Sequence, residues 1–550
     1  MVTRSATLDG TTTVAVFGRV FSWFDDNLQI FNIWADTGAP TNVLNLTFAG
    51  SAWAVDAMTF NSATTLNLNI TEANDGVARY VELMRIINGN ATINLAASFI
   101  QQLRIGDPGQ NSTLRLTLGD GGVGIVRSYD GNDVVTLGNG DAQMISLGDG
   151  INVVNGGAGF IQNLRFGDGT NTFNGGTGRF GSIRAEGNNN FNLLNGGESI
   201  RLEDGNNIVT LNSGVLESLY AFGNETINLL GDARILLLKM DEGVNRLTSE
   251  DGNIETIYAY HARNTIFLGA GGAQQIVLSG SDAAQVIRSD GWLGSLQVYA
   301  SDQSSVQATL VRLGSGGGGY VQTSQGSDHI VTGDGSVQTI LTFDGNDRVT
   351  LGRGGTQFVA LGTGNDVVWL AEMNADVDAL LRGGAGTDRV EFSRFASGVT
   401  ASLDLGNASQ DFGLVGAGRV SLDGFENLVG SAFADVFTGN GLANRMSGGS
   451  GADALFGLAG NDVLSGDRGA DVLTGGEGLD TFLFIPADGS DRITDFTLGE
   501  DIIDLRAANG LADITFTRVG TDVRLTFGTL QIVVEDQTVA AMRDVDNFAF

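Results

Sequence analysis

The chain has 550 residues, of which 82 are Gly and only 3 are Pro, and it contains no Cys. Collagen needs Gly at every third residue and abundant Pro, and a disordered acidic chain does not carry 42% hydrophobic residues, so both classes are excluded. The formal net charge of −33 makes nucleic acid a poor partner and divalent cations good ones, because an acidic surface repels phosphates. We expect an extended folded protein, without disulfides, that metal ions stabilise.

Residues 1–60 are predicted to be an N-terminal cap or a docking and assembly region. They hold three of the five tryptophans, Trp23, Trp34 and Trp53. Aromatic residues suit a cap over an unpaired strand edge, and they are also enriched in interface cores, so both roles stay open. The first twenty residues lack the apolar core of a secretory signal, and no apolar run approaches the length of a membrane span. We therefore expect neither a cleaved leader nor a transmembrane segment.

Residues 61–382 repeat with a period of about 19 residues, which suits one coil of two short strands and two turns. This period predicts a parallel β-solenoid. The repeated polar residue is mainly Asn in the first part and Asp in the last part. The residues expected to stack are Asp133, Asn152, Asn171, Asn190, Asn207, Asn245 and Asn264, followed by Asp328, Asp347 and Asp366.

The change from Asn to Asp along the solenoid predicts a change in ion dependence. Asn side chains can stack amide to amide without charge, as identical side chains do in other parallel stacks. Stacked carboxylates at roughly 5 Å repel one another unless a cation lies between them. We expect the Asn-rich part to fold without calcium and the part from Asp328 onward to need it.

From Gly430 the chain follows a nine-residue period without slippage: GSAFADVFT, GNGLANRMS, GGSGADALF, GLAGNDVLS, GDRGADVLT and GGEGLDTFL. An isolated unit, GGAGTDRVE, begins at Gly383 and contains Asp388. Small residues at the first positions allow a tight turn, the sixth residue directs a side chain into that turn, and an apolar residue at position eight points inward. The pattern resembles the calcium-binding nonapeptides of the RTX (repeats-in-toxin) proteins that Gram-negative type I systems export.

The resemblance implies an all-β chain, a right-handed parallel β-solenoid followed by an RTX β-roll over residues 383–485. Two nonapeptides make one coil, so equivalent turns stack two units apart, and Ca²⁺ takes carboxylate and carbonyl oxygens from neighbouring coils. One edge is expected to stack Asp435, Asp453 and Asp471. The other stacks Asn444, Asp462 and Asp480, with a weak step at Asn444 and its end at Asp480. The full set of expected metal residues also includes Gly448, Gly457, Gly466 and Gly475, together with Asp388, Asp328, Asp347 and Asp366.

Residues 486–550 are expected to close the roll and to carry an uncleaved type I secretion signal. Asp488-Gly-Ser-Asp491 and Gly499-Glu-Asp501 resemble the run that follows the repeats in RTX proteins. The chain ends with an acidic residue followed by apolar ones, Asp546-Asn-Phe-Ala-Phe550, which is similar to type I signals. The resemblance therefore implies secretion to the surface of a Gram-negative bacterium.

The sequence gives little support for an enzyme. The only two histidines, His261 and His329, are too far apart for an H-E-x-x-H helix, and no Ser has Gly at both −2 and +2. Lys239 lies beside Asp241 and Glu242, where a solvated ion pair is the expected explanation. A carbohydrate-active β-helix of the polysaccharide lyase or epimerase type stays open, since mannuronan epimerases also join a β-helix to RTX modules.

The composition and architecture together predict an extracellular, calcium-dependent structural protein that self-associates into sheets or filaments. Surface-layer proteins of Gram-negative bacteria share this plan of a cysteine-free, calcium-loaded solenoid. An adhesin would have a similar sequence. The expected partners are calcium ions, further copies of the chain and cell-surface glycan or lipopolysaccharide, but not nucleic acid.

Overall fold

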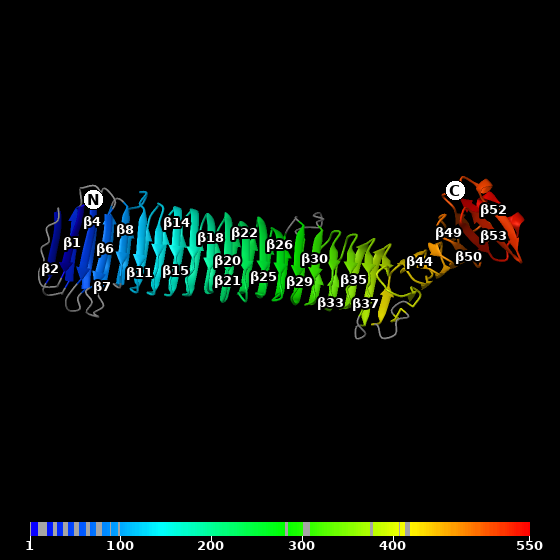
Figure 1. The fold of residues 1–550 in the computed structure, drawn as a ribbon, viewed down its shortest axis with the longest axis horizontal. Helices are drawn as coiled ribbons and strands as arrows, with labels where there is room; N and C mark the ends of the chain where they lie inside the picture. The colour runs from blue at the N-terminus through cyan, green and yellow to red at the C-terminus, as the bar shows by residue number, and fades with distance from the viewer. Residues whose placement is uncertain are drawn as a thin grey trace. The chain divides into compact units, whose positions relative to one another are not determined.

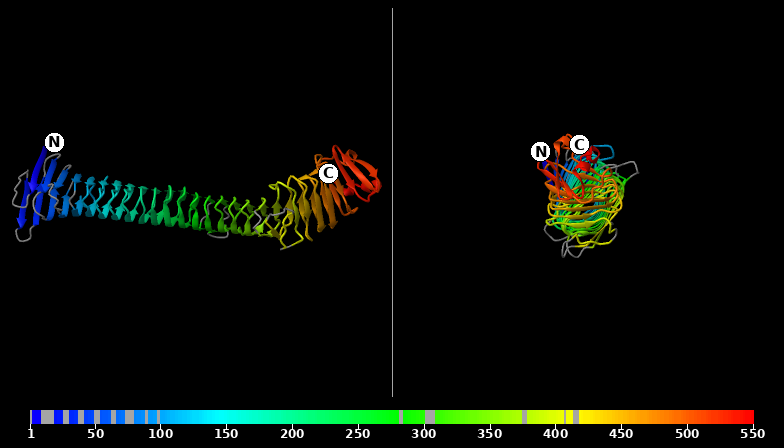
Figure 2. Two further views of the ribbon diagram at one scale, coloured as in Figure 1. Left: turned by 60° about the horizontal axis from the view of Figure 1, so that its bottom comes forward. Right: turned by 90° about the vertical axis from the view of Figure 1, so that its right-hand side faces the viewer.

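The computed structural model describes residues 2–8, 19–25, 30–36, 42–48, 54–61, 66–72, 80–87, 90–96, 99–280, 284–300, 308–373, 378–405, 408–412 and 418–550. The chain divides into two compact units, Met1–Ala273 and Gln274–Phe550, and each is described by itself. Both are parallel β-solenoids in which each coil adds one strand to each sheet (Figures 1 and 2). The predicted all-β class, a solenoid followed by a β-roll, is confirmed.

In the first unit, one face of every coil belongs to sheet A, whose strands pair in parallel. They are β1 Val2–Leu8, β4 Asn42–Phe48, β6 Leu66–Glu72, β8 Ala91–Leu95, β10 Leu114–Leu118, β12 Val134–Thr136, β14 Gly150–Asn155, β16 Gly169–Asn174, β18 Asn188–Leu193, β20 Asn206–Leu211, β22 Asn224–Leu229, β24 Val244–Ser249 and β26 Arg263–Leu268.

The other face belongs to sheet B, which is also parallel except for the antiparallel pair of β2 with β3. Its strands are β2 Arg19–Asp25, β3 Ile30–Asp36, β5 Ala54–Asn61, β7 Tyr80–Ile87, β9 Phe99–Ile105, β11 Val123–Ser128, β13 Ala142–Leu147, β15 Ile161–Phe166, β17 Phe180–Ala185, β19 Gly197–Leu202, β21 Val215–Phe222, β23 Arg234–Asp241 and β25 Ile254–Tyr260. The side chains of Trp23 and Trp34, and all of Trp53, lie outside the described residues.

The core of the first unit lies between the two sheets and consists of alternate apolar residues. Along β16, for example, Phe173 is buried and pairs with Val154 of the preceding coil and Phe191 of the following coil. Period-2 alternation places every second side chain inside, and the parallel register stacks identical positions coil upon coil. Such stacking makes the turn residues line up as well.

Buried amides form a hydrogen-bonded ladder along sheet A, which we call the amide ladder. Asn152 Nδ2 donates to Asn171 Oδ1 at 3.0 Å, Asn171 Nδ2 donates to Asn189 Oδ1 at 3.1 Å, and Asn189 Nδ2 donates to Asn207 Oδ1 at 2.8 Å. The expectation of Asn190 was wrong. Coil spacing falls to 18 residues at this point, so Asn189 pairs with Asn171 and is buried while Asn190 is exposed.

The second unit continues both sheet types and then replaces sheet B with sheet C. β27 Ala273–Ser279 crosses the limit between the units. The strands of sheet A in this unit are β28 Gln285–Ser289, β30 Thr309–Leu313, β32 His329–Val331, β34 Arg348–Thr350, β36 Val367–Trp369, β38 Arg389–Glu391, β41 Asn427–Val429, β43 Arg445–Ser447, β46 Val463–Ser465, β49 Thr481–Leu483, β51 Ile502–Asp504 and β55 Phe548–Ala549.

Sheet B ends at β40, and sheet C begins at β39. The sheet B strands are β29 Leu293–Tyr299, β31 Gly318–Gln322, β33 Val337–Leu341, β35 Thr356–Gly364, β37 Ala379–Gly386 and β40 Val420–Asp423. Sheet C runs in the order β39 Thr400–Ser402, β42 Val436–Thr438, β45 Ala454–Ala459, β48 Val472–Glu477, β50 Ser490–Ile493, β54 Leu530–Val534, β53 Asp522–Phe527 and β52 Thr515–Val519. A small pair joins β44 Ser450–Gly451 to β47 Arg468–Gly469.

The last part of the chain covers the end of the roll. The strands β54, β53 and β52 pair antiparallel and extend sheet C, while β55 adds to sheet A beside β51. The helices among the described residues are short: η1 Leu511–Asp513, α1 Val539–Met542 and η2 Val545–Asn547. None of them is long and apolar enough to cross a membrane. The predicted limits at residues 60, 382 and 485 stay predictions.

Candidate calcium centre

One edge of the roll stacks carboxylates in what we call the first column: Asp435, Asp453, Asp471 and Asp491. The Oδ1 of each member accepts the backbone N–H of the preceding member: Asp435 N to Asp453 at 2.7 Å, Asp453 N to Asp471 at 2.8 Å and Asp471 N to Asp491 at 3.1 Å. The carboxylates therefore stack once per coil, as the two-unit spacing predicts.

The opposite edge holds the second column, which comprises Asn444, Asp462, Asp480 and Asp501. Asn444 N donates to Asp462 Oδ1 at 2.7 Å, Asp462 N donates to Asp480 Oδ1 at 2.9 Å, and Asp480 N donates to Asp501 Oδ1 at 3.0 Å. All four side chains are buried. The prediction that this edge ends at Asp480 was wrong, because Asp501 of the closing segment adds one more carboxylate.

In four of the five repeat aspartates of the columns, the second carboxylate oxygen has no hydrogen-bond partner. Asp453, Asp462, Asp471 and Asp480 each keep a buried Oδ2 without a partner. A buried carboxylate oxygen without a proton donor is costly, so these atoms need either a proton or a cation. Oxygen of this kind is the ligand that Ca²⁺ prefers.

The first glycine of each repeat borders the unpaired oxygen. A Cβ added to Gly457 or Gly475 would collide with Oδ2 of the aspartate five residues later, Asp462 or Asp480, and on Gly457 also with the carbonyl oxygen of Gly475. Gly448 and Gly466 lie in the same way against Asp453 and Asp471. Carboxylate and carbonyl oxygens thus surround a space that only a glycine leaves open. In the part of the chain that the structure describes, no three acidic or His side chains converge, so carbonyls would have to complete the ligand set.

Three positions of the two columns lack an open oxygen. At Asp501, Oδ1 accepts the backbone N–H of Asp480 at 3.0 Å and Oδ2 accepts that of Thr497 at 2.7 Å. Both carboxylate oxygens of Asp435 are hydrogen-bonded, Oδ1 to Val399 N at 2.6 Å and Oδ2 to Ser431 N at 2.6 Å. Asn444 Oδ1 accepts the backbone N–H of Asn440 at 2.8 Å. The expected weak step at Asn444 therefore has a structural counterpart, since its side-chain oxygen is already engaged.

Burial and neighbouring carboxylates raise the pKa of these groups. Burial, followed by the charges of adjacent Asp residues, raises the pKa of Asp453 and of Asp471 to about 7. Burial raises the pKa of Asp462 to about 6, and the pKa of Asp480 is raised for the same reason. Without a cation, these carboxyls hold protons well above the pH at which an exposed Asp releases them.

The acidic residues of the solenoid form a third column. Most of its members differ from those of the roll in the residue that lies five positions before the aspartate. Asp328, Asp347, Asp366 and Asp388 are buried and linked by the same N–H to Oδ1 bonds, at 2.7, 2.7 and 2.9 Å. Of these, Asp388 has a nonapeptide-like glycine, because a Cβ on Gly383 would lie 2.6 Å from its Oδ2. At the equivalent position, five residues before each aspartate, the other three have the buried side chains Thr323, Thr342 and Leu361.

Sequence reasoning did not include Asp491, Asp501 or Glu426 among the site residues. Asp388 N donates to Glu426 Oε2 at 2.7 Å, so Glu426 continues the third column. Asp491 and Asp501 follow the preceding carboxylate by 20 and 21 residues, whereas the repeats step by 18. The sequence signal for these two residues was the D-x-I-x-D motif that begins at Asp491 and the G-x-D-x-I-D motif that contains Asp501. A strict nine-residue period does not predict either position.

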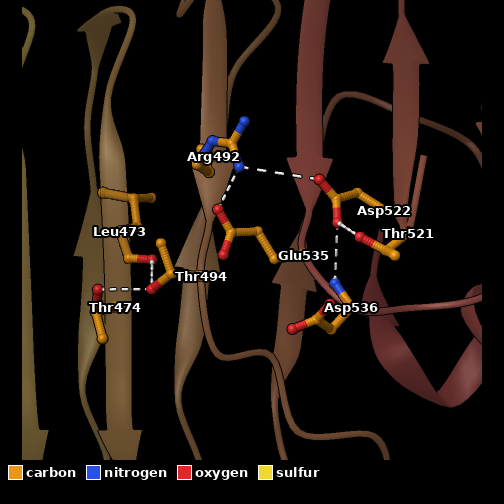
Figure 3. Close-up of polar contacts among 8 residues, drawn as sticks. All are labelled: Leu473, Thr474, Arg492, Thr494, Thr521, Asp522, Glu535 and Asp536. Atoms are coloured by element: carbon orange, nitrogen blue, oxygen red, sulfur yellow. Dashed lines mark hydrogen bonds and ion pairs between the residues drawn. The ribbon is translucent and has the colours of Figure 1, made fainter. Parts of the chain in front are cut away.

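The closing segment is fastened to the roll by polar contacts that Figure 3 shows. Arg492 of β50 forms an ion pair with Glu535 and lies 3.9 Å from Asp522 of β53. Directly after β50, the hydroxyl of Thr494 lies 2.7 Å from the hydroxyl of Thr474 in β48. These contacts hold β50 in place, which fixes the neighbouring Asp491 at the end of the first column.

A family model of the RTX calcium-binding nonapeptide repeat (4 copies) matches residues 421–454 and 447–482. Among solved structures, the AlgE6R3 and AlgE6R2 subunits of the Azotobacter vinelandii mannuronan C5-epimerase are each 32% identical over 22% of this chain, covering 78% and 91% of their own chains, with TM-scores of 0.18. The extracellular lipase LipA from Serratia marcescens is 17% identical over 50% of this chain and 40% of its own, with a TM-score of 0.15. No curated protein matches.

These TM-scores are too low to carry an argument about the fold, so the assignment rests on the repeat model and on the geometry of its turns. The repeat model covers the column residues from Asp435 to Asp480, whereas Asp491 and Asp501 lie beyond its last matched residue. RTX nonapeptides bind calcium, and proteins that carry them are typically secreted. Through these repeats, the chain belongs to the RTX calcium-binding proteins.

Proposed function

We propose that the chain is an extracellular, calcium-dependent structural protein that self-associates on the cell surface, of the surface-layer type. Calcium at the two columns would hold the turns of the roll in their stacked arrangement. The residues proposed to hold the ions are those with an unpaired buried oxygen, Asp453, Asp462, Asp471, Asp480 and Asp491, with carbonyls of the adjoining glycine turns. A bound cation would replace repulsion between carboxylates with attraction.

The observation that carries self-association is that each of three successive turns at the second column exposes a leucine. Leu442, Leu458 and Leu479 are 59%, 40% and 56% exposed, and they come from successive turns at this edge. Exposed leucines that recur on one edge of the roll favour an interface at that edge. Because these turns depend on the carboxylate columns, calcium would order the three leucines and so promote contact with a second copy.

Electron microscopy of the purified full chain, with and without calcium, tests this proposal. The wild-type protein should form sheets or filaments only with calcium, and the triple substitution of Leu442, Leu458 and Leu479 by Ser should prevent assembly. The matched control replaces Ile151, Leu194 and Val244, which are 58%, 48% and 61% exposed in the first unit, by Ser. Assembly by the leucine variant, or dispersed wild-type molecules in calcium, would contradict the proposal.

A carbohydrate-active enzyme is the alternative function. The basic residues considered for such an enzyme are His261, His329 and Lys239. His261 Nδ1 lies 3.3 Å from Asp241 Oδ1. Burial and nearby arginines lower the pKa of His329. The expected ion pair of Lys239 was wrong, because its Nζ lies 5.5 and 5.8 Å from the ring centroids of Tyr220 and Tyr258. Incubation with acidic polysaccharides decides between the readings, since only an enzyme would shorten or epimerise them.

A further inference from the structure

One outward-facing position of sheet B in the first unit gathers arginine from successive coils. Backbone pairing places Arg127 beside Arg104, and Arg165 beside Arg184. Ser146 occupies the coil between Arg127 and Arg165. We call this set the basic column; its members are Arg104, Arg127, Ser146, Arg165, Arg184 and Arg201.

This alignment is unexpected in a chain with 30 basic and 63 acidic residues. Neighbouring strands lie about 4.8 Å apart, and like charges directly opposite one another destabilise a sheet. At one end, Glu203 relieves the repulsion, because it pairs with Arg184 at 3.2 Å and with Arg201 at 2.8 Å. Among the residues that the structure describes, the guanidinium groups of Arg127 and Arg165 have neither an ion-pair nor a hydrogen-bond partner.

A hollow of about 380 Å³ lies at this unpaired part of the basic column. Arg127 and Arg165 border it from two sides, and the short side chain of Ser146 lies between them. Asp130 also lines the hollow, where its Oδ1 accepts the backbone N–H of Asp149 at 3.3 Å. Two free guanidinium groups around an open space form a receptor for an anionic group.

Short polar side chains run beside the basic column on the same face of sheet B. Asn163, Ser182, Ser199 and Ser218 occupy one register position of successive strands. Ser182 Oγ donates to Asn163 Oδ1 at 2.7 Å. Hydroxyl and amide groups can both donate and accept, so this row can exchange hydrogen bonds with sugar hydroxyls.

Beyond Arg201, the register position of the basic column continues as Tyr220, Lys239 and Tyr258. The tyrosine rings flank the ammonium group of Lys239, and all three side chains are half-buried. A tyrosine presents a flat apolar face with a polar tip, on which the apolar face of a sugar ring can pack. Cations and rings thus alternate along one straight path.

We propose that the basic column binds an extended, carboxylate-bearing polysaccharide that lies across the coils of the first unit, with one carboxylate held in the hollow between Arg127 and Arg165. One sugar ring of an extended glycan advances its chain by nearly the coil spacing of about 4.8 Å. Phosphates of one strand of duplex DNA rise by about 3.4 Å along the helix axis and wind around it, so they do not follow a straight column at the coil spacing. Glycan binding of this kind does not depend on the self-association proposed above.

The test is calorimetric titration of the calcium-loaded full chain with polygalacturonate oligomers. Replacing Arg127 and Arg165 together by Gln should weaken binding at least tenfold. The matched control replaces Arg115 and Arg263 by Gln, which removes the same charge from sheet A of the same unit and should leave binding unchanged. Equal affinity of all three proteins would overturn the proposal.

A second variant separates the hollow from general electrostatic attraction. Ser146→Arg adds a positive charge but fills the hollow from an outward-facing position, so binding should weaken. Stronger binding by this variant would show that charge alone attracts the polymer and would overturn the assigned position. Circular dichroism of each variant reports folding. Duplex DNA and neutral dextran serve as further probes, and binding of either as tightly as polygalacturonate would overturn the choice of an acidic glycan.

Discussion

At the scale of single residues, the first and sixth positions of the nonapeptide act together. The aspartate uses one oxygen to accept a backbone N–H from the neighbouring coil, and the glycine leaves space beside the other oxygen. Ser431 shows the contrast, because its N–H occupies the oxygen of Asp435 that is free in the other repeats. Small changes at these two positions therefore decide whether a turn can hold an ion.

Gly466→Ala tests this arrangement in the first column. The added Cβ would collide with Oδ2 of Asp471, so we expect calcium affinity at that turn to fall about tenfold, which is about 1.4 kcal/mol. Gly441→Ala is the matched control within the roll, because nothing lies within 4 Å of an added Cβ there. A calcium titration followed by circular dichroism measures both, and equal affinities would contradict the role of the glycine.

Glu225 interrupts the amide ladder with a buried carboxyl. Its Oε1 accepts from Asn207 Nδ2 at 3.1 Å, but its Oε2 has no partner, and burial raises the pKa of Glu225 from 4.5 to about 7. Between these two values the folded state binds more protons than the unfolded state. Stability therefore falls as pH rises through this window, and the loss is complete above it.

Glu225→Gln should remove this pH dependence because a neutral amide continues the ladder. We expect the free energy of unfolding at pH 8 to increase by about 1–3 kcal/mol, which is the typical cost of an unpaired buried polar group. At pH 4 the variant and the wild type should be alike. Denaturant unfolding of the first unit, followed within the full chain at both pH values, provides the measurement; a constant difference across pH would contradict a titrating Glu225.

At the scale of elements, the closing segment belongs to the calcium columns as well as to the cap. Asp491 precedes the end of β50, and Asp501 precedes β51, so these two strands bring the last carboxylates of both columns into place. Pairing of β50 with β54, and of β51 with β55, covers the strand edges that the last coil would otherwise expose.

Because Asp501 extends the second column beyond Asp480, the expected effect of an Asp480 substitution on calcium binding changes. Asp453 lies between Asp435 and Asp471, and Asp480 now lies between Asp462 and Asp501. We expect Asp480→Asn to weaken calcium binding, because its Oδ2 is unpaired, whereas Asp501→Asn should have a smaller effect, because both oxygens of Asp501 already accept backbone N–H groups. Calcium stoichiometry measured by calorimetry tests the order, and a smaller loss for Asp480→Asn than for Asp501→Asn would contradict the role of the unpaired oxygen.

At the scale of the whole molecule, the two units differ in what stabilises their stacked turns. The first unit has a ladder of amides with Asp133 and Glu225 as its acidic members, whereas the second unit has three columns of buried carboxyls. Neutral amides satisfy one another by hydrogen bonds, but carboxylates need protons or cations. The calcium requirement should therefore be confined to the second unit.

Removal of calcium with a chelator at pH 8 should expose the roll to proteases while the coils of the amide ladder stay protected. At pH 4 the chelated roll should be retained because its carboxyls are protonated. Stability falls as pH rises from the ordinary Asp pKa of 3.8 to the raised values of about 6 to 7, and the loss is complete above them. Limited proteolysis with mass spectrometry identifies the cut sites. Loss of both units together, or no effect of pH, would contradict this account.

The sequence by itself determined the repeats, because Gly, Asp and apolar residues at fixed local spacing each satisfy a local need: a tight turn, an inward carboxylate, a buried strand residue. It also predicted the stacking of Asp453 with Asp471, since a constant period fixes which turns coincide. Tertiary structure alone decided where the period changes. The 18-residue step that buries Asn189, the longer steps that bring in Asp491 and Asp501, and the alignment of Arg127 with Arg165 all depend on the register of neighbouring coils. The register between neighbouring coils is set by packing of the whole coil, so it cannot be predicted from short-range sequence patterns.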